Sequence, residues 1–241
     1  NMKLYINGSL EDNESTNKEL GNSADLEFGG GNVDQCGNSA RYLDGILDEL
    51  YLLNDAVSGD WLETHYNNLS APSAFISISC PSSGNNQAVS GYTDFCTVTI
   101  DHTKVSGSSN LDNFPLMVDI TANSLKTTSN GGFVQSSNGY DIVFTNSDNT
   151  EQYDHQLEGY SAASGNVIAW VRIPELSYSS DTEIRMYYGK TGISADPSTA
   201  DVWPSNYVGA WHLNGDANDK SGNGNNGSTS GISSATGQIA D

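Results

Sequence analysis

The sequence predicts an all-β protein, built from β-sandwich or jelly-roll modules with very little helix. Short apolar or alternating runs recur along the chain, and clusters of Asn, Asp, Ser and Gly separate them, which is typical of sandwich strands and their turns. The 25 glycines among 241 residues favour turns over long helices. No amphipathic pattern of useful helical length appears in the chain.

Residues 1–74 contain strand signals around one short helix. The run MKLYINGSL alternates and meets Asn7-Gly8, a dipeptide typical of two-residue hairpin turns. ADLEFGGG predicts a short strand, and YLDGILDELYLLN predicts a long buried strand that bends at Gly45. In SGDWLETHYNN, Ser58 is placed to cap one or two helical turns. LSAPSAF then has the composition of a linker.

Residues 75–206 predict a β-sandwich, because short strand signals follow one another at hairpin intervals. These signals are TVTIDH, FPLMVDIT, YDIVFTN, YDHQLEGY, NVIAWVRIP and TEIRMYYG. A third region, residues 207–241, begins with the strand signal YVGAWHLNGD and continues into the turn-rich loop ANDKSGNGNNGSTSG.

The charge balance excludes several classes of partner. The chain has 30 acidic and 9 basic side chains, for a net charge of −21. Nucleic acids and anionic membrane surfaces both need basic residues, so neither is expected as a partner. No apolar run reaches the length of a membrane-spanning helix, so we expect no membrane insertion. The acidic excess fits solubility outside the cell, and some of the carboxylates could also gather around calcium.

The chain has three cysteines, and because its composition already points outside the cell, a disulfide among them is expected. Cys80 and Cys96 bracket a loop rich in Gly, Ser and Asn, and a disulfide between them would contribute about 3 kcal/mol. The alternative is a pair of unrelated buried thiols. Cys36 is then the odd cysteine, either buried and free or paired outside this chain.

The two flanks resemble parts of one known kind of module. MKLYINGSL, GILDELYLLNDAVS and the short helix after them resemble the C-terminal half of a bacterial laminin-G-like, concanavalin A-type jelly roll. VGAWHLNGDANDKSGNGNNG resembles the opening of such a module. Between them, NFPLMVDI, YDIVFTNSDN, AWVRIPELS and RMYYGK resemble a sandwich of unassigned function that often precedes such modules in bacterial surface proteins.

This order of pieces suggests an assembly. Half a jelly roll exposes an apolar face and unpaired strand edges, so residues 1–74 need partner strands. These would come from a preceding stretch of the polypeptide or from the tail of a neighbouring copy. We therefore expect a slice of a repetitive surface protein or filament with a structural or adhesive role, secreted or at the cell surface. The alternative is a carbohydrate-binding accessory region of a secreted hydrolase.

The best candidate for a metal site is the loop NGDANDKSGNG, which offers oxygen ligands at Asp216, Asn218 and Asp219. It does not have the pattern of an EF-hand. The resemblance implies structural calcium here, with Asp48 and Glu49 as possible partners, because their strand and the entry strand lie close together in such folds. The alternative is a polar turn that binds nothing.

Little in the sequence supports catalysis, and we expect no enzyme. The four histidines are scattered and match no catalytic or metal-binding pattern. Asp154 and Glu158 could form the carboxylate pair of a glycosidase, but chance pairs are expected among so many acidic residues. Glycans are possible partners, because exposed tryptophans can stack on sugar rings. Most tryptophans here lie in apolar strands, however, which fits packing in the core better. Trp203 is expected to pack at a domain junction.

Overall fold

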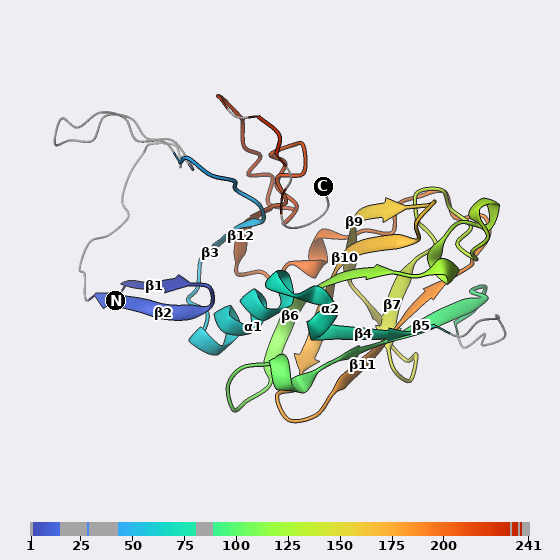
Figure 1. Cartoon of the computed structure of the whole chain (residues 1–241), viewed down its shortest axis with the longest axis horizontal. Helices are drawn as coiled ribbons and strands as arrows, with labels where there is room; N and C mark the ends of the chain where they lie inside the picture. The colour runs from blue at the N-terminus through green and yellow to red at the C-terminus, as the bar shows by residue number, and fades with distance from the viewer. Residues whose placement is uncertain are drawn as a thin grey trace.

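A computed structural model describes residues 2–14, 28, 43–80, 89–231, 233–235 and 237. It is mostly β-strand in antiparallel sheets, which confirms the predicted fold class (Figure 1). In chain order the elements are β1 (Met2–Ile6), β2 (Ser9–Glu14), β3 (Leu50–Leu53), α1 (Gly59–Ser70), α2 (Pro72–Phe75), β4 (Ile76–Ser79), β5 (Asp94–Ile100), β6 (Leu111–Thr121), β7 (Val143–Asn146), β8 (Gln152–Tyr153), β9 (His155–Ser161), β10 (Asn166–Leu176), β11 (Thr182–Tyr188) and β12 (Tyr207–Trp211).

Two packed sheets form the sandwich that the sequence predicts for its middle part. One has the strand order β4-β5-β11-β7-β8 and the other β6-β10-β9. Inward side chains of both sheets make one apolar core, in which Val98, Phe114, Phe144 and Ile184 are completely buried. All six strand signals between residues 94 and 188 are therefore confirmed.

The smaller sheet also buries its outer face. Met117 and Trp170 point away from the sandwich core and pack against Trp203, Tyr207 and Ala210. Tyr207 and Ala210 belong to β12, which pairs antiparallel with β3 in a two-stranded ribbon. β3 and β12, which are far apart in the sequence, thus lie side by side and pack beside the smaller sheet (Figure 1).

The N-terminal flank departs from the sequence prediction in three places. The expected long buried strand is wrong, because only Leu50–Leu53 pairs with β12, and the apolar residues before it are exposed. The expected linker is wrong too, because it forms the end of α1 and the short helix α2, which buries Phe75. The helix after Ser58 is longer than expected, spanning Gly59–Ser70.

Other local predictions for this flank are confirmed. β1 and β2 form a hairpin around Asn7 and Gly8, which have φ angles of 50° and 76°. The Ser58 side chain accepts a hydrogen bond from the Trp61 backbone N–H at 3.1 Å and so caps α1. The expected strand ADLEFGGG, apart from Phe28, and Cys36 lie outside the described residues.

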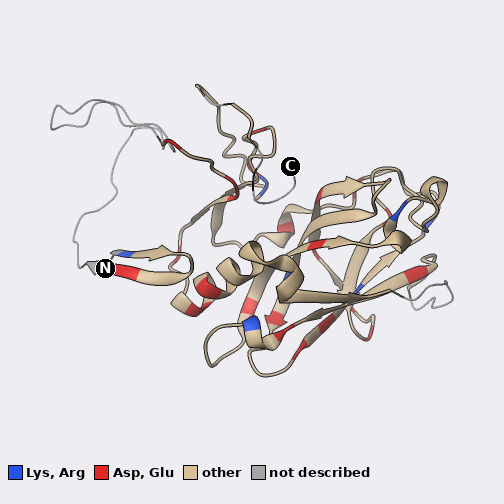
Figure 2. Ribbon diagram, in the orientation of Figure 1, with Lys and Arg blue, Asp and Glu red and all other residues tan. Residues whose placement is uncertain are grey.

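Covalent and electrostatic features agree with the sequence where the structure describes them. Cys80 and Cys96 are joined by a disulfide, as predicted. Acidic residues occur along the whole ribbon diagram and basic ones are few (Figure 2). None of the described helices is long and apolar enough to cross a membrane.

Candidate functional site at the junction of ribbon and sandwich

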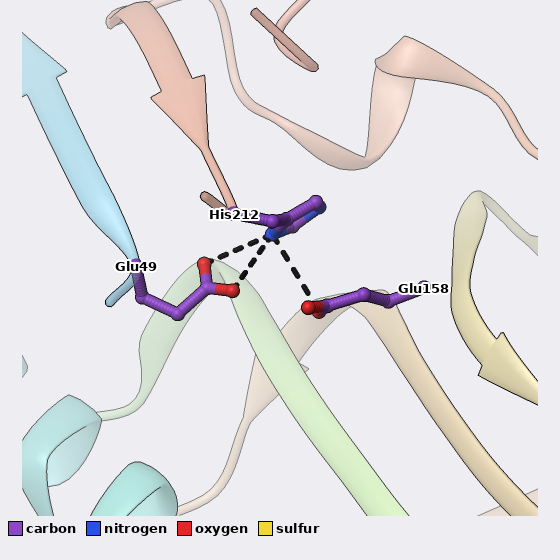
Figure 3. A group of neighbouring side chains, drawn as sticks. All are labelled: Glu49, Glu158 and His212. Carbon is purple, nitrogen blue, oxygen red and sulfur yellow. Dashed lines mark hydrogen bonds and ion pairs between the residues drawn. The ribbon is translucent and has the colours of Figure 1, made fainter. Parts of the chain in front are cut away.

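The β3–β12 ribbon ends in two facing ionisable residues. Leu50 pairs with Trp211 as the last pair of the antiparallel ladder, and Glu49 and His212 are the residues just beyond that pair. His212 Nδ1 lies 2.9 Å from both carboxylate oxygens of Glu49 (Figure 3). The backbone beside this pair is unusual, because Glu49 and Leu213 have φ angles of 53° and 60°. These left-handed conformations are uncommon for residues with such side chains.

A bulge in β9 supplies the third ionisable group. Adjacent residues of β10 pair with Leu157 and Gly159, so Glu158 is the additional residue between them. Bulges commonly redirect a side chain next to a functional site. Glu158 Oε2 accepts a hydrogen bond from Trp170 Nε1 at 2.7 Å and lies 3.5 Å from His212 Nδ1.

Further hydrogen bonds fix the orientation of the pair on the ribbon. The Tyr51 hydroxyl donates to Glu49 Oε2 at 2.6 Å. His212 Nε2 lies 3.0 Å from Gln156 Oε1, which also accepts a hydrogen bond from Trp203 Nε1 at 3.2 Å. Because that amide oxygen can only accept, His212 carries a proton on Nε2. Its Nδ1 therefore faces the two carboxyl groups.

Burial sets the electrostatics of this site. The side chains of Glu49, Glu158 and His212 are only 3%, 3% and 4% exposed. Burial, with a smaller contribution from the nearby charge of Asp48, raises the pKa of Glu49 to about 8. Burial likewise raises the pKa of Glu158 to about 7, and it lowers the pKa of His212. Near neutral pH the three groups therefore share protons instead of carrying full charges.

A cavity of about 220 Å³ reaches Glu158 and His212 from the outside. Its lining residues are Gln156, Leu157, Glu158, Asp196, Ser198, His212, Asn214, Asp216 and Lys220. His212 and Glu158 therefore line the cavity, and Glu49 completes a group of one nitrogen and two carboxylate donors just behind them. Such a set can exchange protons or hold a cation.

The loop predicted to bind calcium lies beside this cavity, but its carboxylates have other partners. Asp219 Oδ1 accepts hydrogen bonds from the Ala210 and Ser221 backbones and from the Ser221 hydroxyl, and its Oδ2 accepts one from the Asn225 backbone. Asp219 thereby fastens the loop to β12. Calcium binding by this loop stays a prediction.

Asp216 is used in a local turn. Its carboxylate accepts hydrogen bonds from the backbone and side chain of Asn218, and the backbone bond lowers the pKa of Asp216. Lys220 Nζ lies 3.6 Å from it. Asp48, the fourth predicted ligand, lies near enough to Glu49 to act on it electrostatically. β3 and the entry strand β12 are paired, as the resemblance implied.

Sequence reasoning missed two members of the site. Glu158 was considered only as a partner of Asp154, whereas the structure pairs Asp154 with Arg172 in an ion pair. His212 was one of four scattered histidines. The end of the β3–β12 ladder brings the side chains of His212 and Glu49 together, but this contact spans 163 residues and no local pattern indicates it.

A second group, Asp101, His102 and Asp181, also has metal-ligating side chains close together. His102 Nδ1 lies 2.6 Å from Asp181 Oδ1. The side chains of His102 and Asp181 are 37% and 51% exposed, so water solvates them. Of the two groups of possible metal ligands among the described residues, the one formed by Glu49, Glu158 and His212 is therefore the buried one.

Comparison with known proteins gives one family match. Residues 138–220 match the family described as "Domain of unknown function (DUF2341)". The matched segment crosses the expected boundary after residue 206 and includes Gln156, Glu158, Trp170 and His212, but not Glu49. No curated protein and no solved structure matches the chain.

Proposed function

We propose that this chain is an extracellular structural or adhesive module of a repetitive surface protein or filament. In this proposal its flanks, which resemble pieces of laminin-G-like jelly rolls, associate with strands of neighbouring modules or copies of the same protein. The disulfide between Cys80 and Cys96 supports an oxidising, extracellular location.

The distribution of exposed apolar side chains carries the proposal. Nine large hydrophobic residues are exposed among those described, and eight of them precede residue 67. They are Leu4, Ile6, Leu10, Phe28, Leu43, Ile46, Leu47 and Tyr66. The sandwich contributes only Tyr178. A surface of this kind usually marks a site of protein association.

Unpaired strand edges support the same proposal. β1–β2 and β3–β12 are separate two-stranded sheets, so every strand in them has one edge without a strand partner among the described residues. Two-stranded sheets are marginally stable alone, and an exposed edge accepts further strands readily. Strands from another module would extend these sheets and cover the apolar side chains.

Light scattering and electron microscopy of the purified chain test the proposal. We expect concentration-dependent assembly that Ile46→Lys weakens, because Ile46 is 60% exposed next to β3. Tyr178→Lys is the matched control, since it charges an exposed apolar residue on the sandwich. A chain that stays monomeric at all concentrations, with no ordered polymer, would contradict assembly.

The alternative is a carbohydrate-binding accessory region of a secreted hydrolase. Sugar stacking needs exposed aromatic rings. Trp170, Trp203 and Trp211 are buried and Trp61 is partly buried, so no tryptophan is available as an exposed platform. Glycan-array binding by the monomer would favour this alternative over the structural role.

A further inference from the structure

We propose that Glu49, Glu158 and His212 bind one divalent transition-metal ion of the zinc class, which fastens the β3–β12 ribbon to the sandwich. The ligands come from the residue before β3, from the bulge of β9 and from the residue after β12. None of these ligands belongs to the predicted calcium ligands Asp216, Asn218, Asp219 and Asp48.

The types of donor indicate the ion. One imidazole nitrogen and two carboxylates suit zinc and related ions, which accept mixed nitrogen and oxygen ligands. Calcium takes six to eight oxygen ligands at longer distances, and the site offers a nitrogen at its centre. A divalent cation that displaces the protons of these two buried carboxyl groups would also balance the negative charge that they then carry.

The separation of the donor atoms fits a shared ion. Ligands about 2.1 Å from one ion lie about 3.0–3.4 Å from each other. His212 Nδ1 lies 2.9 Å from either oxygen of Glu49 and 3.5 Å from Glu158 Oε2 (Figure 3). The three side chains thus need only small movements to surround an ion.

Each proposed ligand is held by an outer hydrogen bond. Tyr51 holds Glu49 and Trp170 holds Glu158, while the His212 Nε2–H donates to Gln156. Metal-binding histidines and carboxylates usually have outer partners of this kind, which fix the ring orientation and leave the other nitrogen free. A histidine buried only for packing would not need its Nδ1 aimed at two carboxyl groups.

An unsatisfied buried atom points to a missing ligand. Glu158 Oε1 has no hydrogen-bond partner, although the side chain is 3% exposed. Leaving a buried carboxylate oxygen unpaired is costly, and a metal ion bound by both oxygens of Glu158 would satisfy it. The cavity lined by Glu158 and His212 gives the ion a route in and leaves room for a water ligand.

Zinc titration of the whole disulfide-bonded chain, after dialysis against EDTA, tests the site by calorimetry and thermal unfolding. We expect one zinc ion per chain and a higher Tm in its presence. Co²⁺ should give a visible absorption band that zinc abolishes. Glu158→Gln and Glu49→Gln keep the outer hydrogen bonds but should each weaken zinc binding by at least about tenfold.

Asp181→Asn is the matched control, because it removes a carboxylate from the exposed group beside His102. It should leave zinc binding at the junction unchanged. Zinc binding that is lost in Asp181→Asn and kept in Glu158→Gln would assign the ion to the exposed group and overturn the proposal. Absence of zinc binding, or equal affinity in all variants, would overturn it as well. If a Gln variant fails to fold by circular dichroism, the Co²⁺ band of the native chain decides, and its absence overturns the site.

Discussion

The side-chain amide of Asn68 pairs with the backbone of Met117 as a neighbouring strand would. Asn68 Nδ2 donates to the Met117 carbonyl at 2.9 Å, and the Met117 N–H donates to Asn68 Oδ1 at 2.7 Å. Both residues are completely buried. Because β6 is the edge strand of the smaller sheet, this residue of α1 satisfies backbone groups that have no strand beside them.

Replacing Asn68 with Ala should therefore destabilise the sandwich strongly. The change leaves a buried N–H and a buried C=O unpaired, at about 1–3 kcal/mol each. We expect urea unfolding to show a loss of about 2–5 kcal/mol. Asn67→Ala is the matched control, because its side chain makes one exposed hydrogen bond, to the Lys104 carbonyl. Equal losses in the two variants would refute the strand-like role of Asn68.

Reducing the disulfide between Cys80 and Cys96 should also lower stability. The cross-link spans a sequence separation of 16 and joins the chain just after β4 to β5. Its removal frees the unfolded chain and should cost about 3 kcal/mol. The measurement is the urea midpoint with and without dithiothreitol, in a Cys36→Ser background that prevents thiol exchange. An unchanged midpoint would show that the cross-link does not restrict the unfolded chain.

Local signals predicted the sandwich well. Alternating runs gave its strands, Asn7-Gly8 gave the hairpin, and the loop between Cys80 and Cys96 gave the disulfide. The sequence predictions were wrong where contacts with distant parts of the chain determine the local structure. LSAPSAF reads as a linker, yet Pro72 fits the first position of a helix and Phe75 completes the core.

The ribbon and its site could not be read from local patterns. The leucine-rich run before β3 looks like one strand, but β12 pairs with only four of its residues, so Leu43, Ile46 and Leu47 stay exposed. Glu158 meets His212 only because of the bulge in β9 and the packing of the ribbon on the smaller sheet. Neither feature has a sequence signal.

The absence of a side chain at Gly209 lets the Trp211 ring pack directly against the backbone of β12. A Cβ at this position would lie 2.1 Å from the Trp211 ring. That ring also donates from Nε1 to the Asn225 carbonyl at 3.0 Å. Gly209→Ala should displace the indole and loosen the loop after β12, at about 1–3 kcal/mol.

Thermal unfolding and tryptophan fluorescence measure the effect of Gly209→Ala. Gly45→Ala serves as the control, because a Cβ there meets only the Leu43 side chain at 3.7 Å in an exposed segment. That control should change stability by less than about 0.5 kcal/mol. A Gly209→Ala chain as stable as the control would show that Trp211 has room to move.

His65 is a buried histidine without a polar partner. It stacks on Trp61 with ring centroids 4.8 Å apart, and Tyr51 and Trp170 lie at 5.3 and 6.2 Å. Neither ring nitrogen has a hydrogen-bond partner. Burial lowers the pKa of His65 to about 4, from 6.5 in the unfolded chain.

This shift should make stability depend on pH in a definite direction. Between pH 6.5 and 4 the unfolded chain binds a proton at His65 that the folded chain excludes. Stability therefore falls as the pH is lowered through this range, by about 3 kcal/mol from this residue.

His65→Phe keeps an aromatic ring and removes the proton-binding group. The difference between the unfolding free energies of His65→Phe and the native chain should therefore grow as the pH falls. His102→Gln is the control, because it removes an exposed histidine and should leave the contribution of His65 in place. A difference for His65→Phe that stays constant from pH 7 to pH 4 would mean that His65 is protonated as easily in the folded chain as in the unfolded one.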